Sequence, residues 1–151
     1  MADDFAIIVG FMSNSANGAL MSIGSNVSDT PLITLDVSGG SHRVFLRDDA
    51  AVAVNLTSAY TTGIVAVQSV RKVANTKVLR ANGTQLATSS TAQGATTLTT
   101  SKVGVQTRIA DANYLSGSIS IVIAVKGTLT DAELLLLERF AASVTPGAPV
   151  F

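Results

Sequence analysis

Residues 114–142 read YLSGSISIVIAVKGTLTDAELLLLERFAA, and this stretch decides the fold class. Its first part, Gly117–Val125, is rich in the β-branched residues that favour strands. Thr130 then provides a good helix N-cap, and Glu133, three residues later, completes a capping box. The stretch therefore predicts a strand that leads directly into a short helix over about 131–142.

Upstream of this stretch, the chain consists of short apolar or alternating runs separated by turn residues. The expected strands span residues 5–12, 19–24, 32–38, 42–47, 51–57, 63–73, 77–81, 84–88 and 102–108. The dipeptide Asn82-Gly83 is the strongest hairpin signal, because both residues tolerate the positive φ of a tight turn. Many short strands at this spacing predict an all-β fold, an antiparallel two-sheet jelly-roll sandwich with one short C-terminal α-helix.

The predicted helix has an unusually wide apolar stripe. Its members are Leu134, Leu135, Leu136, Leu137, Phe140, Ala141 and Val144. A stripe that only had to cover one sheet would be narrower. The width predicts a helix that packs on the sheets with one side and on a second surface with another.

Composition excludes several classes of function. The chain of 151 residues fits a single domain over 1–151. Ten basic and ten acidic residues balance, which argues against a nucleic-acid surface or an electrostatic membrane patch. The chain has no cysteine, so it forms no disulfide and no thiolate metal site. No apolar run approaches the ~18 residues of a membrane span. We therefore expect no nucleic-acid partner and no membrane partner.

The chain is also apolar for a β-rich domain. Hydrophobic residues make up 47% of it, and charged residues only 13%, roughly half of the usual ~25%. Two interpretations remain open. In one, the abundant Ser and Thr residues solvate the outward faces. In the other, partner subunits cover part of the surface.

Three segments carry a resemblance to concanavalin A-like, laminin-G-type jelly rolls. Phe5–Met12 with Ala19–Gly24 is similar to the early strand pair of that family. Lys77–Ala87, with Asn-Gly at its centre, resembles the family's hairpin. Gly117–Glu133 is the most specific match, because the family ends in a strand that leads through "L-[ST]-x-x-E" into a short helix. The resemblance spans roughly 5–142 and implies the same jelly-roll fold.

The chain departs from the family pattern in several places. It has no Trp, although the strand at 64–70 usually begins with an aromatic residue, and Leu79 occupies a position that is usually Tyr. The usual polar residues after the strand 119–125 are lacking. Only residues 1–4 precede Phe5, so we expect a domain that lacks the family's usual N-terminal strand. Either the chain is trimmed, or another polypeptide supplies that edge.

The resemblance implies a non-enzymatic structural or interaction module. Laminin-G-like jelly rolls of this cysteine-free composition resemble bacteriophage virion components such as decoration, head-fibre or tail-associated proteins. On this interpretation the chain is located in a virion, and its partners are other protein subunits in a homo-oligomer or a virion assembly. The alternative is a carbohydrate-binding module of a phage fibre or of an extracellular bacterial protein, with a cell-surface glycan as its ligand.

No catalytic constellation is visible in the sequence. Glycosidases need two carboxyl groups roughly 5–9 Å apart across a cleft. Asp3-Asp4 and Asp48-Asp49 are adjacent pairs, whose members point to opposite faces if they lie on strands. His42 is the only histidine, and we expect it to be a solvated turn residue. The capping argument accounts for both glutamates, so we expect the protein not to be an enzyme.

Candidate sugar-binding residues are the two tyrosines, Tyr60 and Tyr114, together with Asn113. All lie in predicted loops. Aromatic faces and polar loop groups are the usual means of binding sugars in this fold family, and exposure of both tyrosines on one rim would favour such a site. The competing interpretation is a buried or capping tyrosine.

We expect no cofactor, with Ca²⁺ as the alternative. Asp29 and Asp111 are the leading candidate ligands, with Asp36 and Asn113 as further oxygen donors, because calcium takes oxygen ligands from loops. No D-x-D-x-D pattern is present. Turn formation by these residues is therefore the favoured interpretation.

Assembly residues are expected at the C-terminal strand and the tail. Ile119, Ile121 and Ile123 form an apolar run that would be an aggregation hazard at an unpaired edge. We expect a neighbouring chain to cover that edge, either by strand addition or through the tail residues Val150 and Phe151.

Overall fold

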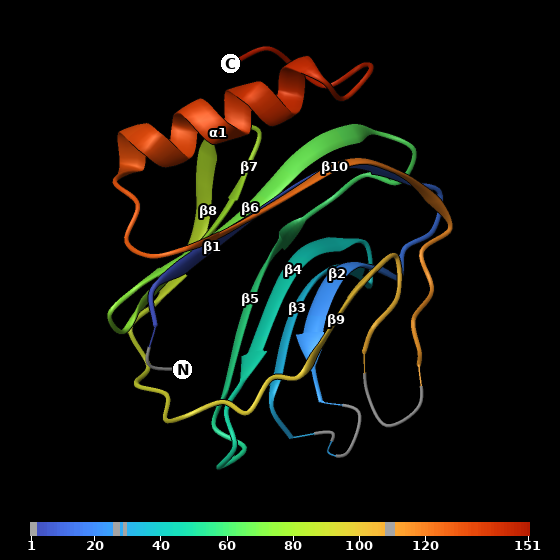
Figure 1. Ribbon diagram of the computed structural model, residues 1–151. Helices are drawn as coiled ribbons and strands as arrows, with labels where there is room; N and C mark the ends of the chain where they lie inside the picture. Colours follow the sequence, from blue (N-terminus) through green and yellow to red (C-terminus); the bar gives the residue numbers. More distant parts are fainter. Residues whose placement is uncertain (1–2, 26–27, 29, 108–110) are drawn as a thin grey trace.

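The computed structural model describes residues 3–25, 28, 30–107 and 111–151. Two five-stranded antiparallel sheets pack face to face, and a single helix in the described part of the chain lies on the outside of one of them (Figure 1). The all-β sandwich with a C-terminal helix is therefore confirmed. No helix in the described residues is long and apolar enough to cross a membrane.

The strands divide between two sheets according to their order in the chain. The elements are β1 (Phe5–Ser13), β2 (Gly18–Gly24), β3 (Leu32–Ser38), β4 (Ser41–Arg47), β5 (Ala53–Ala59), β6 (Val65–Val73), β7 (Thr76–Ala81), β8 (Thr84–Ser89), β9 (Thr100–Val103), β10 (Gly117–Lys126) and α1 (Asp131–Ser143). The helix-side sheet has the order β10-β1-β6-β7-β8. The open sheet has the order β5-β4-β3-β2-β9.

The main core lies between the inner faces of the two sheets. Strand β1 lies between β10 and β6 in the helix-side sheet and is buried on both faces, which explains its continuous apolar sequence. Phe11 is fully buried there and packs against the rings of His42 and Tyr60. On the open sheet, β4 alternates strictly, with Val44 and Leu46 facing inward.

Turn chemistry sets the tight connection between β7 and β8. Asn82 and Gly83 form this turn with φ values of 49° and 75°. Positive φ at both central residues matches the twist of the flanking strands. The predicted hairpin is confirmed.

Strand β9 is shorter than predicted. The sequence pattern predicts a strand over 102–108, but β9 ends at Val103. Gly104 follows with φ of 76° and donates its backbone N–H to the carbonyl of Leu20, which turns the chain away from the sheet. The chain then passes over the outward face of the open sheet, where the hydroxyl of Ser22 donates to the carbonyl of Val105 at 3.0 Å.

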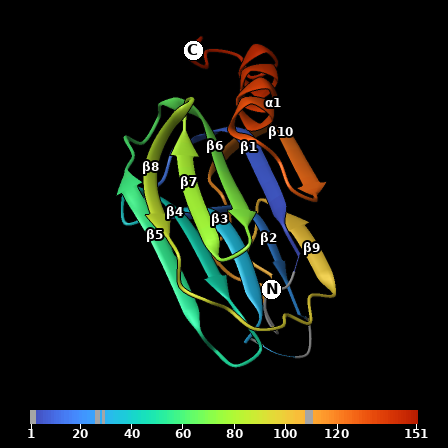
Figure 2. The same ribbon diagram turned by 90° about the vertical axis from the view of Figure 1, so that its left-hand side faces the viewer.

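Helix α1 begins with the predicted capping box. The Thr130 side chain accepts the backbone N–H of Glu133, and the Glu133 carboxylate accepts the backbone N–H of Thr130. Leu134 and Ala141 are fully buried against the outer faces of β1 and β6. The helix therefore covers one face of the helix-side sheet (Figure 2).

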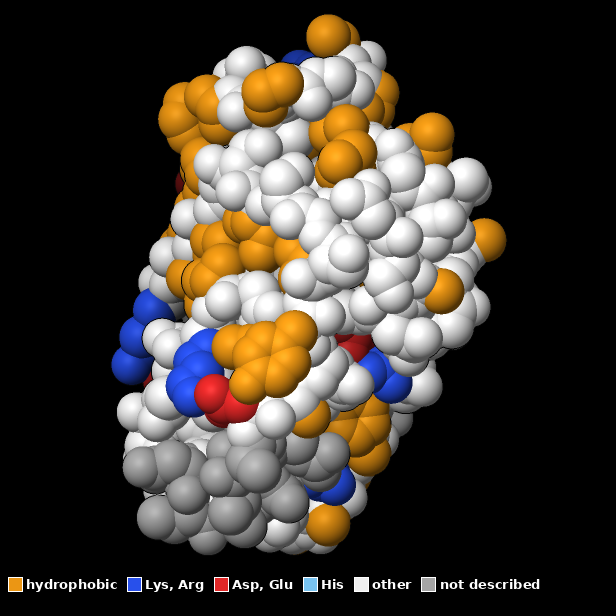
Figure 3. All heavy atoms as spheres, turned by 90° about the vertical axis from the view of Figure 1, so that its right-hand side faces the viewer, with side chains coloured by type: hydrophobic (Ala, Val, Ile, Leu, Met, Phe, Trp, Pro, Cys, Tyr) orange, Lys and Arg blue, Asp and Glu red, His pale blue; other side chains and the backbone are white. Residues whose placement is uncertain are grey.

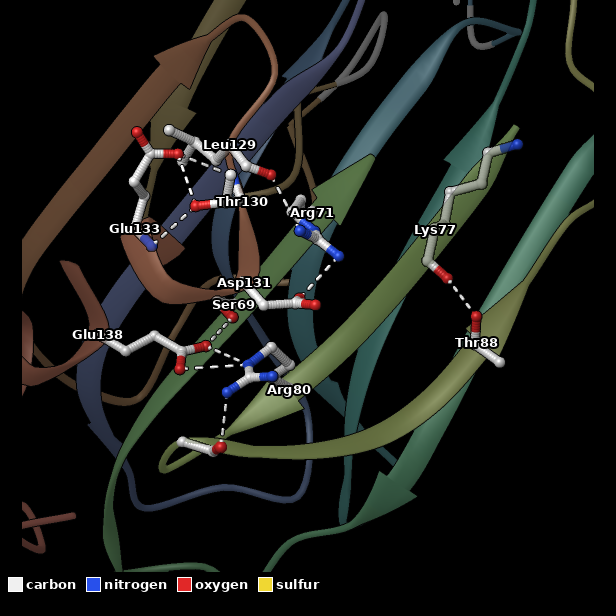
Figure 4. A network of polar contacts seen from close by, with 11 residues as sticks. Ser69, Arg71, Lys77, Arg80, Thr88, Leu129, Thr130, Asp131, Glu133 and Glu138 are labelled. Atoms are coloured by element: carbon white, nitrogen blue, oxygen red, sulfur yellow. Dashed lines mark hydrogen bonds and ion pairs between the residues drawn. The ribbon is translucent and has the colours of Figure 1, made fainter. Parts of the chain in front are cut away.

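Polar contacts fix α1 on the sheet as well as apolar ones. Arg80 from β7 donates to both carboxylate oxygens of Glu138 at 2.9 and 3.2 Å, and the hydroxyl of Ser69 donates to Glu138 at 2.5 Å (Figure 4). Arg71 donates to the carbonyl of Leu129 at 2.9 Å and pairs with Asp131 at 2.8 Å. Glu138 is thus a buried structural carboxylate, which corrects the expectation that capping accounts for both glutamates.

Candidate functional site on the open sheet

The outward face of the open sheet presents two arginines and an aromatic ring. Arg43, Phe45 and Arg47 alternate along β4 with buried residues, so all three project outward. The register places Phe45 beside Thr34 of β3 and Arg43 beside Asp36. No helix covers this face in the described part of the chain, whereas α1 covers the corresponding face of the other sheet (Figure 1).

A hollow of about 270 Å³ opens on this face. Its lining consists of Leu32, Arg43, Phe45, Arg47, Gln106 and Asn113. The first four come from β3 and β4, and the last two come from the chain that follows β9. The hollow is close to the lower end of the ~300–1,000 Å³ usual for small-molecule sites, which matches a single sugar ring or a group of similar size.

Arg43 is held by a carboxylate within the sheet. Its Nε donates to Oδ1 of Asp36 at 2.7 Å, and its Nη2 donates to Oδ2, so the pair is bidentate. Burial raises the pKa of Asp36, with the contact to Arg43 acting in the opposite direction. The hydrogen bond to Asp36 raises the pKa of Arg43. Asp36 is therefore committed to Arg43 and is not free as a calcium ligand.

Arg47 has hydrogen-bonding capacity to spare. Its Nε donates to the carbonyl of Thr30 at 2.6 Å, but its Nη2 is buried and has no hydrogen-bond partner. The guanidinium lies 5.8 Å from the centre of the Phe45 ring, which restrains its position. A buried donor without an acceptor costs about 1–3 kcal/mol.

Gln106 and Asn113 close the hollow on the side away from β4. Nδ2 of Asn113 donates to Oε1 of Gln106 at 2.6 Å. The backbone carbonyl of Asn113 accepts the backbone N–H of Ala19 at 2.8 Å, so hydrogen bonds hold both the backbone and the side chain of Asn113 in place. Asn113 adopts a positive φ of 51°. Asn113 was predicted as a sugar-site residue, and the structure places it in the hollow.

The two tyrosines do not share a rim. Tyr114 follows Asn113 and is 67% exposed, as a sugar-stacking residue would be. Tyr60 is only 8% exposed, and its hydroxyl donates to the carbonyl of Ile64 at 2.7 Å and accepts from the backbone N–H of Ser13 at 3.1 Å. The ring of Tyr60 is enclosed by the core, so the expectation that both tyrosines face a ligand is wrong for Tyr60.

The calcium candidates do not come together. Asp111 forms an ion pair with Lys102 at 2.6 Å, and Asp36 is paired with Arg43 as described above. Asp29 lies outside the described residues. No group of three or more His, Cys, Asp or Glu residues with metal-binding geometry occurs among those that are described.

His42 is buried, which corrects the expectation of a solvated turn residue. It is 5% exposed, and its Nδ1 lies 2.9 Å from Oε1 of Gln68. Nε2 of Gln68 in turn donates to the backbone carbonyl of Arg43 at 2.7 Å. Burial lowers the pKa of His42, because the charged imidazolium loses hydration. The histidine thus links β6 to β4 through the core.

The predicted assembly residues divide into two groups. Ile119, Ile121 and Ile123 are half-buried in β10, which is an edge strand. The tail folds back onto its own chain: the carbonyl of Phe151 accepts from Nε of Arg139 at 2.6 Å, and its ring packs against the β7–β8 turn at Gly83. Val150 is fully exposed. Phe151 therefore has an intramolecular contact that the sequence did not indicate.

The residues that line the hollow were mostly missed at the level of sequence. Arg43, Phe45 and Arg47 stand at alternate positions in the run HRVFLR, a pattern that places them on one face of a strand. That signal was available. The sequence does not indicate which of the two sheets keeps an uncovered outer face, or that Gln106 lies beside these three residues. Both depend on contacts between residues that are distant in the sequence.

Solved structures that are similar to this chain include carbohydrate-binding modules. The chain matches the "IT-sialidase CBM40" of Ruminococcus gnavus bound to α2,3-sialyllactose with a TM-score of 0.79 and 19% identity, over 91% of this chain and 83% of that one. It matches a NanB sialidase of Streptococcus pneumoniae with a TM-score of 0.76 and 11% identity, over 89% of this chain and 24% of that one. The binding domain of botulinum neurotoxin serotype D matches with a TM-score of 0.68 and 10% identity, over 91% of this chain and 37% of that one.

These likenesses show a shared β-sandwich fold. The chain spans most of the R. gnavus module but only about a quarter of the NanB sialidase. Solved structures with this fold thus include separate binding modules and parts of sialidases. No family model matches the chain, and no curated protein matches it.

Proposed function

We propose that this protein is a non-catalytic carbohydrate-binding module that recognises an anionic, carboxylate-bearing glycan on the outward face of the open sheet. The observation that carries the proposal is a hollow of sugar size lined by two arginines, a phenylalanine and two side-chain amides, on a sheet face that no described helix covers. A sugar carboxylate would accept a charge-assisted hydrogen bond from the guanidinium of Arg47, which lines this hollow. Sialyllactose, which the R. gnavus module binds, carries such a group.

The other lining residues have roles that suit a sugar. Phe45 contributes apolar surface to the hollow, and its ring lies close to the guanidinium groups of both arginines. Gln106 and Asn113 offer amide groups for hydroxyls. Arg43 is already paired with Asp36, whereas Arg47 has no carboxylate partner among the described residues and so carries the free positive charge of the hollow. Tyr114, next to Asn113 in the chain, gives a second exposed aromatic ring.

The test compares 3′-sialyllactose with lactose, which lacks the carboxylated sugar, by isothermal titration calorimetry. We expect binding of sialyllactose only. Arg47→Met should weaken it at least tenfold, equivalent to about 1.4 kcal/mol. Lys126→Met removes an exposed cation outside the hollow and serves as the matched control with unchanged affinity. Absence of binding to both sugars at millimolar concentration, or equal binding by the Arg47→Met variant, would refute the proposal.

A second candidate is a structural component of a larger assembly, such as a bacteriophage virion. The observation that favours it is the uncovered edge of β10 together with exposed apolar residues on α1. A glycan-binding role would place the protein in an extracellular setting, whereas the structural role would place it in a virion. Recovery of the protein from purified virions, against its recovery from culture medium, separates the two settings.

A further inference from the structure

Strand β10 is an edge strand with little protection against pairing. It forms hydrogen bonds with β1 on one side, and none of the described strands pairs with its other side. Natural edge strands are usually protected by charges, proline or short length. β10 has ten residues, and its one charged residue, Lys126, stands at the end. Its free edge is therefore a template for a further strand.

Both faces of β10 are apolar, which is typical of a strand inside a sheet. Ile119 and Val122 pack towards the core between the sheets, whereas Ile121 and Ile123 pack towards α1. All four are only half-buried. The core covers one face of β10 and α1 partly covers the other, so both faces are apolar and only partly shielded at this edge.

The helix extends the apolar surface beyond this edge. Asp131 and Glu138 lie on the flank of α1 that faces β6 and β7, where they pair with Arg71 and Arg80. Because successive helix residues are rotated by about 100°, the residues on the opposite flank lie on the side of β10. That flank carries Phe140 and Val144, which are 54% and 43% exposed, with Leu136 adjoining at 64%. Figure 3 shows hydrophobic side chains on the helix at the top of the molecule and again on the side below it.

A hollow between the sheets also opens beside β10. It has a volume of about 500 Å³ and is lined in part by Ala124 and Val125 of β10, with Ile23 and Leu98 across from them. A chain added along the free edge would lie between the helix flank on one side and the margin of this hollow on the other. Three separate apolar features therefore converge on one edge.

We propose that β10 pairs antiparallel with β10 of a second copy of this chain, across a two-fold axis near Val122. The occupant of the edge must be apolar on both faces. In this chain β1 also meets that requirement, but it is already paired on both sides. β10 itself meets the requirement and is free. Such self-complementary pairing is the usual form of a two-fold interface.

Charge and register support the antiparallel direction. A two-fold axis at Val122 places Ile121 of one copy opposite Ile123 of the other, and it brings the two helix flanks together. The two Lys126 residues then lie at opposite ends of the joint. A parallel pairing would put them side by side, and like charges directly opposite are destabilising.

The first test is native mass by sedimentation as a function of concentration. We expect a reversible dimer, and Phe140→Lys should raise its dissociation constant at least tenfold, because a buried charge would then face the partner helix. Val52→Lys is the matched control, since Val52 is an exposed apolar residue away from β10 at 40% exposure. A strict monomer at high micromolar concentration, or a dimer equally insensitive to both changes, would overturn the proposal.

The second test uses the absence of native cysteine. Ile121 and Ile123 lie on the same face of β10 and face each other across the proposed axis. A mixture of Ile121→Cys and Ile123→Cys chains should form more disulfide-linked dimer than either variant alone, whereas Ser101→Cys on the edge strand β9 should form none. Equal cross-linking of each variant by itself would indicate parallel pairing and would overturn the antiparallel arrangement.

Discussion

Arg80 lies on the outer face of the helix-side sheet and Arg47 lies on the outer face of the open sheet, but the two side chains have different surroundings. Arg80 is bonded to Glu138 and to the carbonyl of Gly83, and α1 covers the face around it. Among the described residues, Arg47 has one carbonyl partner and a buried nitrogen with no acceptor, and no described helix covers its face of the sheet. The arginine on one face is satisfied within the chain, whereas the arginine on the other face has fewer partners and lines a hollow that is open to a ligand. The contrast separates a stabilising face from a binding face.

The largest expected effect is on the helix-covered face. Glu138→Ala would leave Arg80, whose side chain is 11% exposed, without its carboxylate partner. Breaking a buried ion pair by removing one partner costs about 3–5 kcal/mol. We expect a loss of free energy of unfolding of about 3 kcal/mol by urea denaturation, because the Gly83 carbonyl still accepts from Arg80.

The matched control for this change is Thr130→Ala at the exposed end of the same helix. It removes one side-chain cap and should cost about 1 kcal/mol. A Glu138→Ala variant that loses no more stability than Thr130→Ala would show that the covered face does not depend on its buried pair. The contrast between the faces would then have no energetic basis.

A smaller effect concerns the core that joins the two faces. The pKa of His42 is lowered below its ordinary 6.5 by burial. The unfolded chain therefore binds the proton first as the pH falls, so stability should decrease from pH 6.5 downward, towards the folded-state pKa. The slope is at most about 1.4 kcal/mol per pH unit for one group.

Urea denaturation at several pH values between neutrality and the folded-state pKa measures this slope. His42→Gln removes the only imidazole of the chain, so the difference between the two proteins isolates its contribution. The raised pKa of Asp36 acts in the opposite direction, because the folded state then keeps its proton to higher pH. Parallel stability curves for the two proteins would contradict the assigned role of His42.

Local patterns in the sequence predict the elements of this fold well. The strand over 42–47, the Asn82-Gly83 turn and the Thr130 capping box are all set by residues near one another in the chain, and each appears in the structure as expected. The exception is β9, where the apolar pattern continues past Gly104 but the chain turns away. A positive φ at glycine is permitted rather than required, so the sequence alone does not indicate it.

The environments of polar residues could not be predicted in the same way. His42 and Glu138 look like surface residues in sequence, yet both are buried because partners distant in the chain, Gln68 and Arg80, satisfy them. Tyr60 follows a strand as a loop residue would, but the core encloses it. The burial of a single polar side chain depends on which sheet packs over it, and the residues next to it in the sequence do not determine that packing.

The smallest expected effect is at the rim of the open face. Lys102 on β9 pairs with Asp111, and both side chains are partly exposed, at 37% and 30%. Pairs of this kind contribute about 0.2–1 kcal/mol to stability. The register places Lys102 beside Ser22, in the same cross-strand row as Thr34 and Phe45. Its charge therefore acts on a ligand in the hollow at long range rather than by contact.

Lys102→Met should accordingly change the free energy of unfolding by less than about 0.5 kcal/mol. If the open face binds an anionic glycan, the same change should weaken 3′-sialyllactose binding about twofold to threefold at low salt, and the difference should vanish near physiological salt, where the screening length is about 8 Å. Calorimetric titrations at two salt concentrations measure this. Arg47→Met should keep its effect at both concentrations, because a desolvated contact is screened far less than a rim charge. Loss of affinity that is equally salt-sensitive in both variants would mean that Arg47 attracts the ligand without contacting it, and the distinction between the hollow and its rim would fail.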